Sequence, residues 1–300
     1  MTQSHLFSYS GLYKKLLGSI AVLMLATACQ TVKTTNPGVV GVDRPQKMGL
    51  SSAKMEQMSS LAYTDTLQKA KLAGKLNIDP ALTGRVNKIS QRVIEQVPAF
   101  RPDAKDWKWE VNTIRSDEAN AFAMAGGKVV VYSGLITKLK LTDDELAAVM
   151  GHEIAHALRE HTREQQSTRL LGDVAVLVAE VAGANKQAVG LASDAFNLFG
   201  LKHSRRDETE ADLIGVELAA RAGYDPRASI TLWQKFAAIS GARPLEFLNT
   251  HPSPENRQVV LREASAKVLP LYQQTQANLE PPREQRAAPV PAKKRVLKRK

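Results

Sequence analysis

Two histidines and a glutamate stand at a spacing that suits metal chemistry. The run His152-Glu153-Ile154-Ala155-His156 has the pattern H-E-x-x-H. On an α-helix, residues four apart differ by about 40° of rotation, so both imidazoles project from one face, one turn apart. Two neutral imidazole nitrogens in that arrangement can bind one Zn²⁺ ion. Glu153 lies about 100° away from His152, so it can act as a general base on a water at the metal without binding the metal itself.

The alternative interpretation of these residues is an exposed helix that carries two incidental histidines. The neighbouring side chains of Val149, Met150 and Ile154 are apolar, which indicates that the helix is buried. Buried imidazoles and a buried carboxylate need polar partners, and a metal ion provides them. The pattern therefore favours a metal site.

A catalytic zinc site needs a third protein ligand and one open position. The extended motif that takes a histidine six residues after the second one is excluded here, because Thr162 stands at that position and Arg159 replaces the required glycine. His161 is one residue away from that position, and on a continuous helix its angle turns it away from the pair. The third ligand must therefore come from another segment.

A later charged segment offers that ligand. Glu208 and Asp212 are four residues apart, so they share one helix face. Glu208 can bind zinc while Asp212 accepts an N–H from a ligating histidine and fixes its tautomer, whereas Glu210 points elsewhere. Ala211 and Gly215 are small enough to let two helices approach closely. The alternative is a solvated helix face on which both carboxylates are surface acids.

The helix that carries the histidine pair has a clear start signal. Residues Thr142-Asp143-Asp144-Glu145 form a capping box ahead of a strong helical pattern. We expect further helices over residues 51–73 and 79–97, strands over 107–114 and 128–132, and a mostly helical chain from there to about residue 273. The fold class predicted is α+β, predominantly helical, with a small β-sheet.

The start of the chain has the pattern of a bacterial export signal. Residues 16–28 are uncharged and mostly apolar, and they are too few for a typical transmembrane helix. Small residues at 26–28 precede Cys29, the only cysteine of the chain. This arrangement resembles a lipobox, so we expect residues 1–28 to be a signal peptide and Cys29 to be lipidated. The alternative is an ordinary secretory signal followed by a chance cysteine.

Composition divides the rest of the chain into three parts. Residues 29–49 contain two prolines and little periodicity, so we expect a lipid-anchored tether. The folded domain is predicted over residues 50–273. Residues 274–300 are rich in proline and in basic residues, and we expect them to be disordered.

The basic net charge of +11 is concentrated at the two ends of the chain. Residues 283–300 contribute +7 and residues 1–28 contribute +2, which leaves the body nearly neutral. A folded basic face is not expected, so nucleic acid is an unlikely partner. The tail is a solubilising end or a contact for an anionic surface.

The two motifs together resemble the zinc peptidases of metallopeptidase family forty-eight. H-E-x-x-H occupies residues 152–156, and S-R-x-x-E-x-x-A-D-x-x-G occupies residues 204–215. The resemblance covers roughly residues 50–272 and is closest to the periplasmic lipoprotein proteases of that family. It implies a gluzincin-type zincin domain whose active site lies between the H-E-x-x-H helix and the later glutamate-bearing helix. One Zn²⁺ per chain would be bound by His152, His156 and Glu208, with Glu153 as the catalytic glutamate.

A shorter segment also resembles that family. Asn120, Ala121, Phe122 and Ala123, followed by two glycines at 126–127, are similar to its N-A-F-A-x-P-G-G segment, with an alanine in place of the proline. We expect this segment or the strand over 128–132 to provide a sheet edge that binds an extended substrate. The alternative is that both are ordinary core strands.

His251 begins a segment that is similar to the late H-P-x-x-x-x-R element of the family, which ends here at Arg257. Three roles are open to His251: a fourth metal ligand in a resting state, a donor to a developing oxyanion, or a cap of the following helix.

Residues 170–183 are the most apolar internal stretch, too short and too charged to span a bilayer. By resemblance they are a lid or a membrane-facing helix, and a core helix is the alternative.

The resemblance implies a zinc-dependent endopeptidase of the bacterial cell envelope that cleaves misfolded or unassembled envelope proteins. It would be an outer-membrane lipoprotein facing the periplasm, held to the membrane by the lipid on Cys29, with the outer-membrane assembly machinery as a further partner. The rival class is a chaperone-like assembly or binding factor. Its zinc site would be largely closed, because a structural site fills all four positions with protein ligands.

Overall fold

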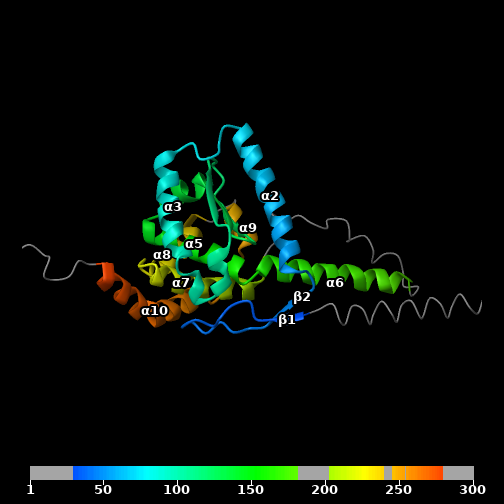
Figure 1. Cartoon of the computed structure of the whole chain (residues 1–300). Coiled ribbons are helices and arrows are strands. Elements are labelled where there is room, and N and C mark those ends of the chain that lie inside the picture. The colour runs from blue at the N-terminus through cyan, green and yellow to red at the C-terminus, as the bar shows by residue number, and fades with distance from the viewer. Residues whose placement is uncertain (1–29, 182–202, 240–244, 254, 280–300) are drawn as a thin grey trace, which may run out of the picture.

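The computed structural model describes residues 30–181, 203–239, 245–253 and 255–279 of the 300-residue chain (Figure 1). The described helices are α2 (Ser52–Leu72), α3 (Pro80–Ile94), α4 (Ser133–Leu139), α5 (Asp143–Leu158), α6 (His161–Val181), α7 (Arg205–Arg221), α8 (Ala228–Ile239), α9 (Glu246–Thr250) and α10 (Arg257–Leu279). The strands are β1 (Gln30–Val32), β2 (Gln46–Met48), β3 (Glu110–Ile114), β4 (Ala121–Met124) and β5 (Lys128–Tyr132). The predicted class, mostly helical α+β with small sheets, is confirmed.

The larger sheet has the strand order β3-β5-β4. β5 pairs in parallel with β3 and antiparallel with β4, so β4 lies at an edge. Val129, Val130 and Val131 of β5 are fully buried, as expected of the central strand. α2 and α3 flank this sheet, and α5 packs beneath β4 (Figure 1). The sheet therefore presents one edge strand directly above the helix that carries the H-E-x-x-H pattern.

α5 begins at the predicted capping box. The Thr142 hydroxyl accepts from the Glu145 backbone N–H at 3.2 Å, and the Glu145 carboxylate accepts from the Thr142 N–H at 2.9 Å. Burial alone would raise the pKa of Glu145, but hydrogen bonds from Lys235 and the Thr142 backbone lower it below its ordinary value. From Glu145 to Leu158 every residue of α5 is buried, so this helix forms the centre of the domain.

α5 and α7 cross at two glycines. A Cβ atom at Gly151 would lie 2.5 Å from the carbonyl oxygen of Gly215, and one at Gly215 would lie 2.7 Å from the backbone nitrogen of His152. Only glycine allows the two backbones to approach this closely. The small residues expected on α7 therefore bring its acidic side chains next to the histidines of α5.

Residues 30–49, which we call the strap, pack against the folded domain. β1 and β2 pair antiparallel, and Val40 and Val42 between them join the hydrophobic core. The buried side chain of Gln46 donates to the carbonyl of Arg159 at 2.7 Å. The strap is held by polar contacts to distant residues, which leave no periodic pattern in its own sequence.

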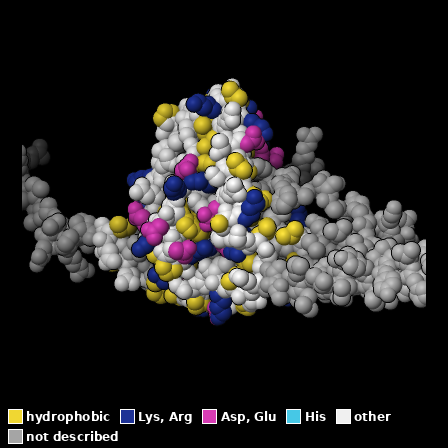
Figure 2. Space-filling model, turned by 45° about the vertical axis from the view of Figure 1, so that its right-hand side comes forward, with side chains coloured by type: hydrophobic (Ala, Val, Ile, Leu, Met, Phe, Trp, Pro, Cys, Tyr) yellow, Lys and Arg dark blue, Asp and Glu magenta, His cyan; other side chains and the backbone are white. Residues whose placement is uncertain are grey.

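Several predictions concern residues outside the described part of the chain. These residues are 1–28, where a signal peptide is expected, Cys29, the end of the apolar stretch 170–183 and the tail beyond residue 279. α10 continues to Leu279, past the expected start of the tail at residue 274. In the described ranges, no helix combines the length and apolar character needed to cross a membrane. Figure 2 shows Lys and Arg interspersed with Asp and Glu on the face that it presents.

Candidate active site

Four buried side chains converge between α5, α7 and α9. His152 and His156 from α5, Glu208 from α7 and His251 at the end of α9 each offer one ligand atom, and these atoms lie within 4.8 Å of one another. Nε2 of His152 is 3.1 Å from Nε2 of His156 and 3.3 Å from Nδ1 of His251. Glu208 Oε1 is 3.4 Å from His156 Nε2 and 3.0 Å from His251 Nδ1. The structure thus brings together the three ligands expected from the sequence and adds His251 as a fourth donor.

The proton positions on the two α5 histidines follow from what their outer nitrogens contact. Asp212 Oδ1 is 3.0 Å from His152 Nδ1. A carboxylate only accepts, so the proton of a neutral His152 is on Nδ1 and its Nε2 directs a lone pair into the cluster. This contact is the one expected for Asp212.

His156 is oriented by a different partner, His161. Glu210 Oε2 lies 3.2 Å from His161 Nε2, which places the proton of a neutral His161 on Nε2. Nδ1 of His161 then accepts from Nδ1 of His156 at 2.8 Å. Nε2 of His156 is therefore also a lone pair directed into the cluster.

The position of His161 corrects the expectation that it turns away from the pair. That expectation assumed one continuous helix. α5 ends at Leu158, and Glu160 adopts φ of 50°, so the chain changes direction before α6 begins at His161. The new direction returns the His161 ring to the outer side of His156, where it is a hydrogen-bond partner and not a member of the four-donor cluster.

The donor set fits a zinc ion. Two imidazole lone pairs 3.1 Å apart repel each other unless a cation lies near both, and imidazole and carboxylate are ordinary zinc ligands. Burial alone would lower the pKa of His152, but Glu208 and Asp212 raise it to about 9. The cluster therefore attracts positive charge strongly. The H-E-x-x-H pair and Glu208 form a site for one zinc ion.

Glu153 lies beside this cluster and is buried. Its Oε1 has no hydrogen-bond partner among the described residues, although His251 Nε2 lies 3.5 Å from it. Burial raises the pKa of Glu153 above its ordinary value. A raised pKa brings a carboxylate closer to the range in which a general base works at neutral pH.

Arg257 is a functional residue that the sequence marked only as the end of a family element. Its Nε donates to Asp212 Oδ2 at 2.7 Å, and its Nη2 donates to Glu208 Oε2 at 2.8 Å. Its guanidinium carbon lies 3.3 Å from the ring centroid of Trp233. One buried cation thus holds both α7 carboxylates in the orientation that faces the histidines.

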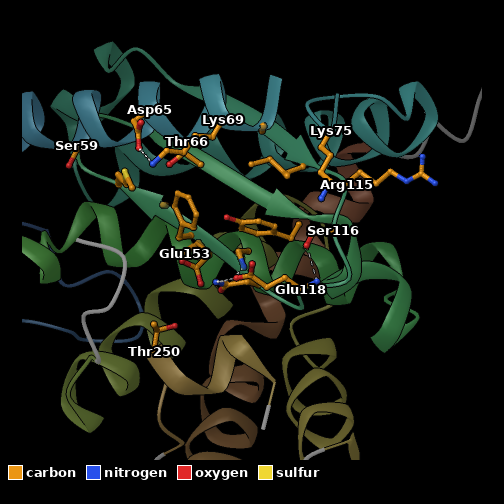
Figure 3. Close-up of a pocket in the computed structure, with 18 of the residues that line it drawn as sticks. Ser59, Asp65, Thr66, Lys69, Lys75, Arg115, Ser116, Glu118, Glu153 and Thr250 are labelled. Carbon is orange, nitrogen blue, oxygen red and sulfur yellow. Dashed lines mark hydrogen bonds and ion pairs between the residues drawn. The ribbon is translucent and has the colours of Figure 1, made fainter. Parts of the chain in front are cut away.

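A cleft of about 590 Å³ opens over the site. β4 and the preceding Asn120 line it together with Glu153 and His251. Figure 3 shows Thr66 and Lys69 of α2 along one side of the cleft, with Glu153 and Thr250 on the opposite side. The segment Asn120, Ala121, Phe122 and Ala123 therefore borders the cleft. His203, which sequence reasoning missed, also lines the cleft.

A helical α+β fold with a zinc-type site between an H-E-x-x-H helix and a glutamate-bearing helix defines a metallopeptidase of the gluzincin type. The sequence pattern of Peptidase family M48 matches residues 80–265, which is more than half of the chain. The chain belongs to Peptidase family M48.

Characterised relatives share part of their length with this chain. It is 39% identical over 171 residues to the mitochondrial metalloendopeptidase OMA1 of Schizosaccharomyces pombe, covering 55% of this chain and 49% of that protein. It is 31% identical over 208 residues to the β-barrel assembly-enhancing protease of Escherichia coli, covering 66% of this chain and 42% of that protein. The chain thus spans less than half the length of these two relatives.

Proposed function

We propose that this protein is a zinc-dependent endopeptidase of the bacterial cell envelope that cleaves misfolded or unassembled envelope proteins. The observation that carries the proposal is the convergence of His152, His156 and Glu208 beside Glu153, at the floor of a cleft bordered by an edge strand. Membership of Peptidase family M48 supports the reaction. The name of the Escherichia coli relative, a β-barrel assembly-enhancing protease, supports the envelope setting and the outer-membrane assembly machinery as a partner.

Different residues of the chain have different roles in peptide hydrolysis. Zinc bound by His152, His156 and Glu208 would supply Lewis acidity for the scissile carbonyl and acidify a water at the site. Glu153 takes a proton from the attacking water as the water oxygen bonds to the carbonyl carbon and the π electron pair moves to the carbonyl oxygen. Glu153 then passes this proton to the amide nitrogen as the C–N bond breaks. Asp212 and Arg257 hold the ligands in place.

Substrate binding is assigned to the edge strand. β4 pairs with β5 on one side, and its other side borders the cleft. An extended peptide that pairs with this edge is held through main-chain hydrogen bonds, which do not depend on the peptide sequence. Asn120 and the strand residues Ala121, Phe122 and Ala123 therefore suit unfolded substrates of varied sequence.

The experiment that tests this function replaces Glu153 by glutamine. Glu153→Gln keeps the size of the side chain and removes the base. We expect the purified variant to retain about one zinc per chain, measured by mass spectrometry of the metal, while cleavage of casein falls by about 10²-fold or more. Glu255→Gln, at a side chain that is 86% exposed, is the matched control and should cleave normally. Wild-type cleavage by Glu153→Gln with zinc in place would contradict the mechanism.

We also propose that Cys29 is lipidated and that the domain faces the periplasm from the outer membrane. The supporting feature is the run of small residues before the only cysteine. Because β1 starts at Gln30 and the strap is packed, the lipid would hold the domain close to the membrane. Cys29→Ser should abolish palmitate labelling and release the protein from membranes. Unlabelled wild-type protein that still sediments with membranes would contradict this assignment.

The second candidate function is a chaperone-like assembly factor with a closed zinc site. One observation favours it: His251 supplies a fourth protein donor to the cluster. Four protein ligands are typical of structural zinc, whereas catalytic zinc keeps an open position. X-ray absorption at the zinc edge, combined with casein cleavage, separates the two. Four protein ligands and no cleavage by the wild type would favour the assembly factor.

A further inference from the structure

His203 lies at the active-site cleft although it is outside the four-donor cluster. Its backbone N–H donates to the carbonyl of Thr250 at 2.9 Å, which fixes its position just before α7. Its ring stacks on His156 with centroids 4.0 Å apart and planes at 27°. The ring centroid of His251 is 5.3 Å away. His203 therefore lies within reach of a substrate group bound beside the cluster.

The tautomer of His203 is set by Gln165 on α6. The amide nitrogen of Gln165 lies 3.3 Å from Asp207 Oδ2 and 2.8 Å from His203 Nδ1. A carboxylate only accepts, so the NH₂ group of Gln165, and not its oxygen, faces Asp207. The second hydrogen of that NH₂ group then points to Nδ1 of His203. Nδ1 is an acceptor, and the proton of a neutral His203 is on Nε2.

The N–H at Nε2 of His203 has no acceptor within the described ranges of the chain. His251 differs from it in this respect. Nδ1 of His251 lies 3.0 Å from Glu208, and its Nε2 lies 3.5 Å from Glu153, so both nitrogens face groups of the site itself. Of the two histidines at the cleft wall, His203 is the one with an oriented donor left for a ligand.

We propose that His203 is a catalytic residue that donates a hydrogen bond from Nε2 to the scissile carbonyl oxygen of the substrate. The inference rests on the peptidase function proposed above. When the water oxygen bonds to the carbonyl carbon, the π electron pair moves to the carbonyl oxygen and Glu153 receives the water proton. His203 keeps its own proton and stabilises the new negative charge. A donor that is already oriented needs no rearrangement at that moment.

The kinetic test uses two variants of His203. His203→Phe keeps a ring against His156 and removes the donor, whereas His203→Gln keeps an N–H near the position of Nε2. We expect His203→Phe to retain zinc and KM while kcat falls by about 10²–10³-fold, the usual cost of one oxyanion donor. His203→Gln should restore most of kcat. Zinc loss, an unchanged kcat, or a change confined to KM in His203→Phe would overturn the inference. Failure of the wild type to cleave would instead refute the proposed function.

A second measurement does not depend on activity or metal. Imidazole ¹⁵N spectra of the metal-free protein should show His203 with its proton on Nε2. Gln165→Leu should change that tautomer population and reduce kcat, whereas Gln57→Leu, at an exposed site on α2, should change neither. A wild-type His203 with its proton on Nδ1 would overturn the inference, whether or not the enzyme cleaves peptides.

Discussion

Two buried polar clusters lie on opposite sides of α7. The metal-facing cluster consists of His152, His156, Glu208, Asp212, His251 and Arg257. The strap-facing cluster consists of Arg44, Gln46, Arg159, Glu164 and Glu210. α7 contributes acids to both, because Glu208 and Asp212 share a face and Glu210 lies two residues away on another. One helix and one type of side chain thus serve two environments.

Charges are matched in the strap-facing cluster. Arg159 Nη2 lies 2.7 Å from Glu210, and Arg44 Nη1 lies 2.7 Å from Glu164, with Arg44 also paired to Glu210. Gln46 donates to Glu164 at 2.7 Å. Asp207 Oδ1 also lies 3.6 Å from Arg44, and Arg206 lies 3.9 Å from Glu164, so three guanidinium groups meet three carboxylates. Backbone carbonyls accept further donors. A cluster that is satisfied in this way holds structure and leaves no group available for chemistry.

Charges are unmatched in the metal-facing cluster. Arg257 faces both Glu208 and Asp212, and the buried Glu153 beside them adds a third carboxylate. Three carboxylates thus lie near a single guanidinium, and two of them, Glu208 and Asp212, raise the pKa of His152. Burial is common to both clusters, so burial does not identify the active site. The active site is identified instead by its surplus of carboxylates and by the imidazole lone pairs that converge on one point.

The difference between the two clusters is tested most strongly by replacing one glutamate of each cluster with glutamine. Glu208→Gln should lower zinc from about one per chain to none after dialysis and abolish casein cleavage, because a ligand is lost. Glu164→Gln should keep both zinc and kcat and reduce only the free energy of unfolding. Metal analysis and cleavage assays check both variants. If Glu210→Ala empties the site while Glu208→Gln retains zinc, the ligand assignment is wrong.

A smaller loss of zinc affinity is expected when Asp212, the residue that orients His152, is replaced. Asp212→Ala removes the acceptor at His152 Nδ1, and we expect zinc affinity to fall by about 10–100-fold, as for other partners of metal-bound histidines. Asp212→Asn, which keeps an acceptor oxygen, should lose less zinc affinity than Asp212→Ala. Competition with a chromogenic chelator measures both. Equal affinities for wild type and Asp212→Ala would assign Asp212 to the fold alone.

The metal-facing cluster was largely predictable from the sequence because its spacings are local. His152 and His156, like Glu208 and Asp212, are four residues apart within single helices, and helical geometry alone places each pair on one face. The capping box at Thr142 and the small residue Gly215 were equally local signals. Periodicity of this kind is visible without a structure.

The parts that could not be predicted depend on chain direction or on distant partners. His161 reaches His156 only because Glu160 turns the chain. Arg44 in the strap meets Glu164 and Glu210 at separations of 120 and 166 residues, and no sequence pattern records such contacts. His203 is oriented by a glutamine 38 residues away. These positions are products of tertiary packing.

The strap-facing cluster predicts a difference between two ion pairs of the strap. Arg44→Met removes a side chain that is 21% exposed, and we expect a loss of about 1.5–3 kcal/mol in the free energy of unfolding, typical of hydrogen bonds to charged groups. Lys33→Ala breaks an exposed pair with Asp43 and should cost at most about 1 kcal/mol. Urea unfolding measures both. Equal losses would mean that the buried cluster does not hold the strap.

The smallest expected effect is a dependence on pH that belongs to the strap-facing cluster. Burial alone would raise the pKa of Glu164, but hydrogen bonds from Arg44 and Gln46 lower it below the ordinary value of 4.5. A carboxyl whose pKa is lowered in the folded state contributes stability that is fully present above its unfolded pKa. That contribution is lost as the pH falls through the lowered, folded-state pKa.

Metal-free wild type and Glu164→Gln should therefore differ by a constant free energy of unfolding above about pH 5, because Glu164 is ionised in both states there. Below that pH the difference should shrink, since protonation removes from the wild type the same charge that the variant lacks. Urea unfolding at a series of pH values measures it, and metal-free protein excludes loss of zinc as a cause. A difference that disappears near neutral pH would mean that Arg44 does not stabilise the charged form of Glu164.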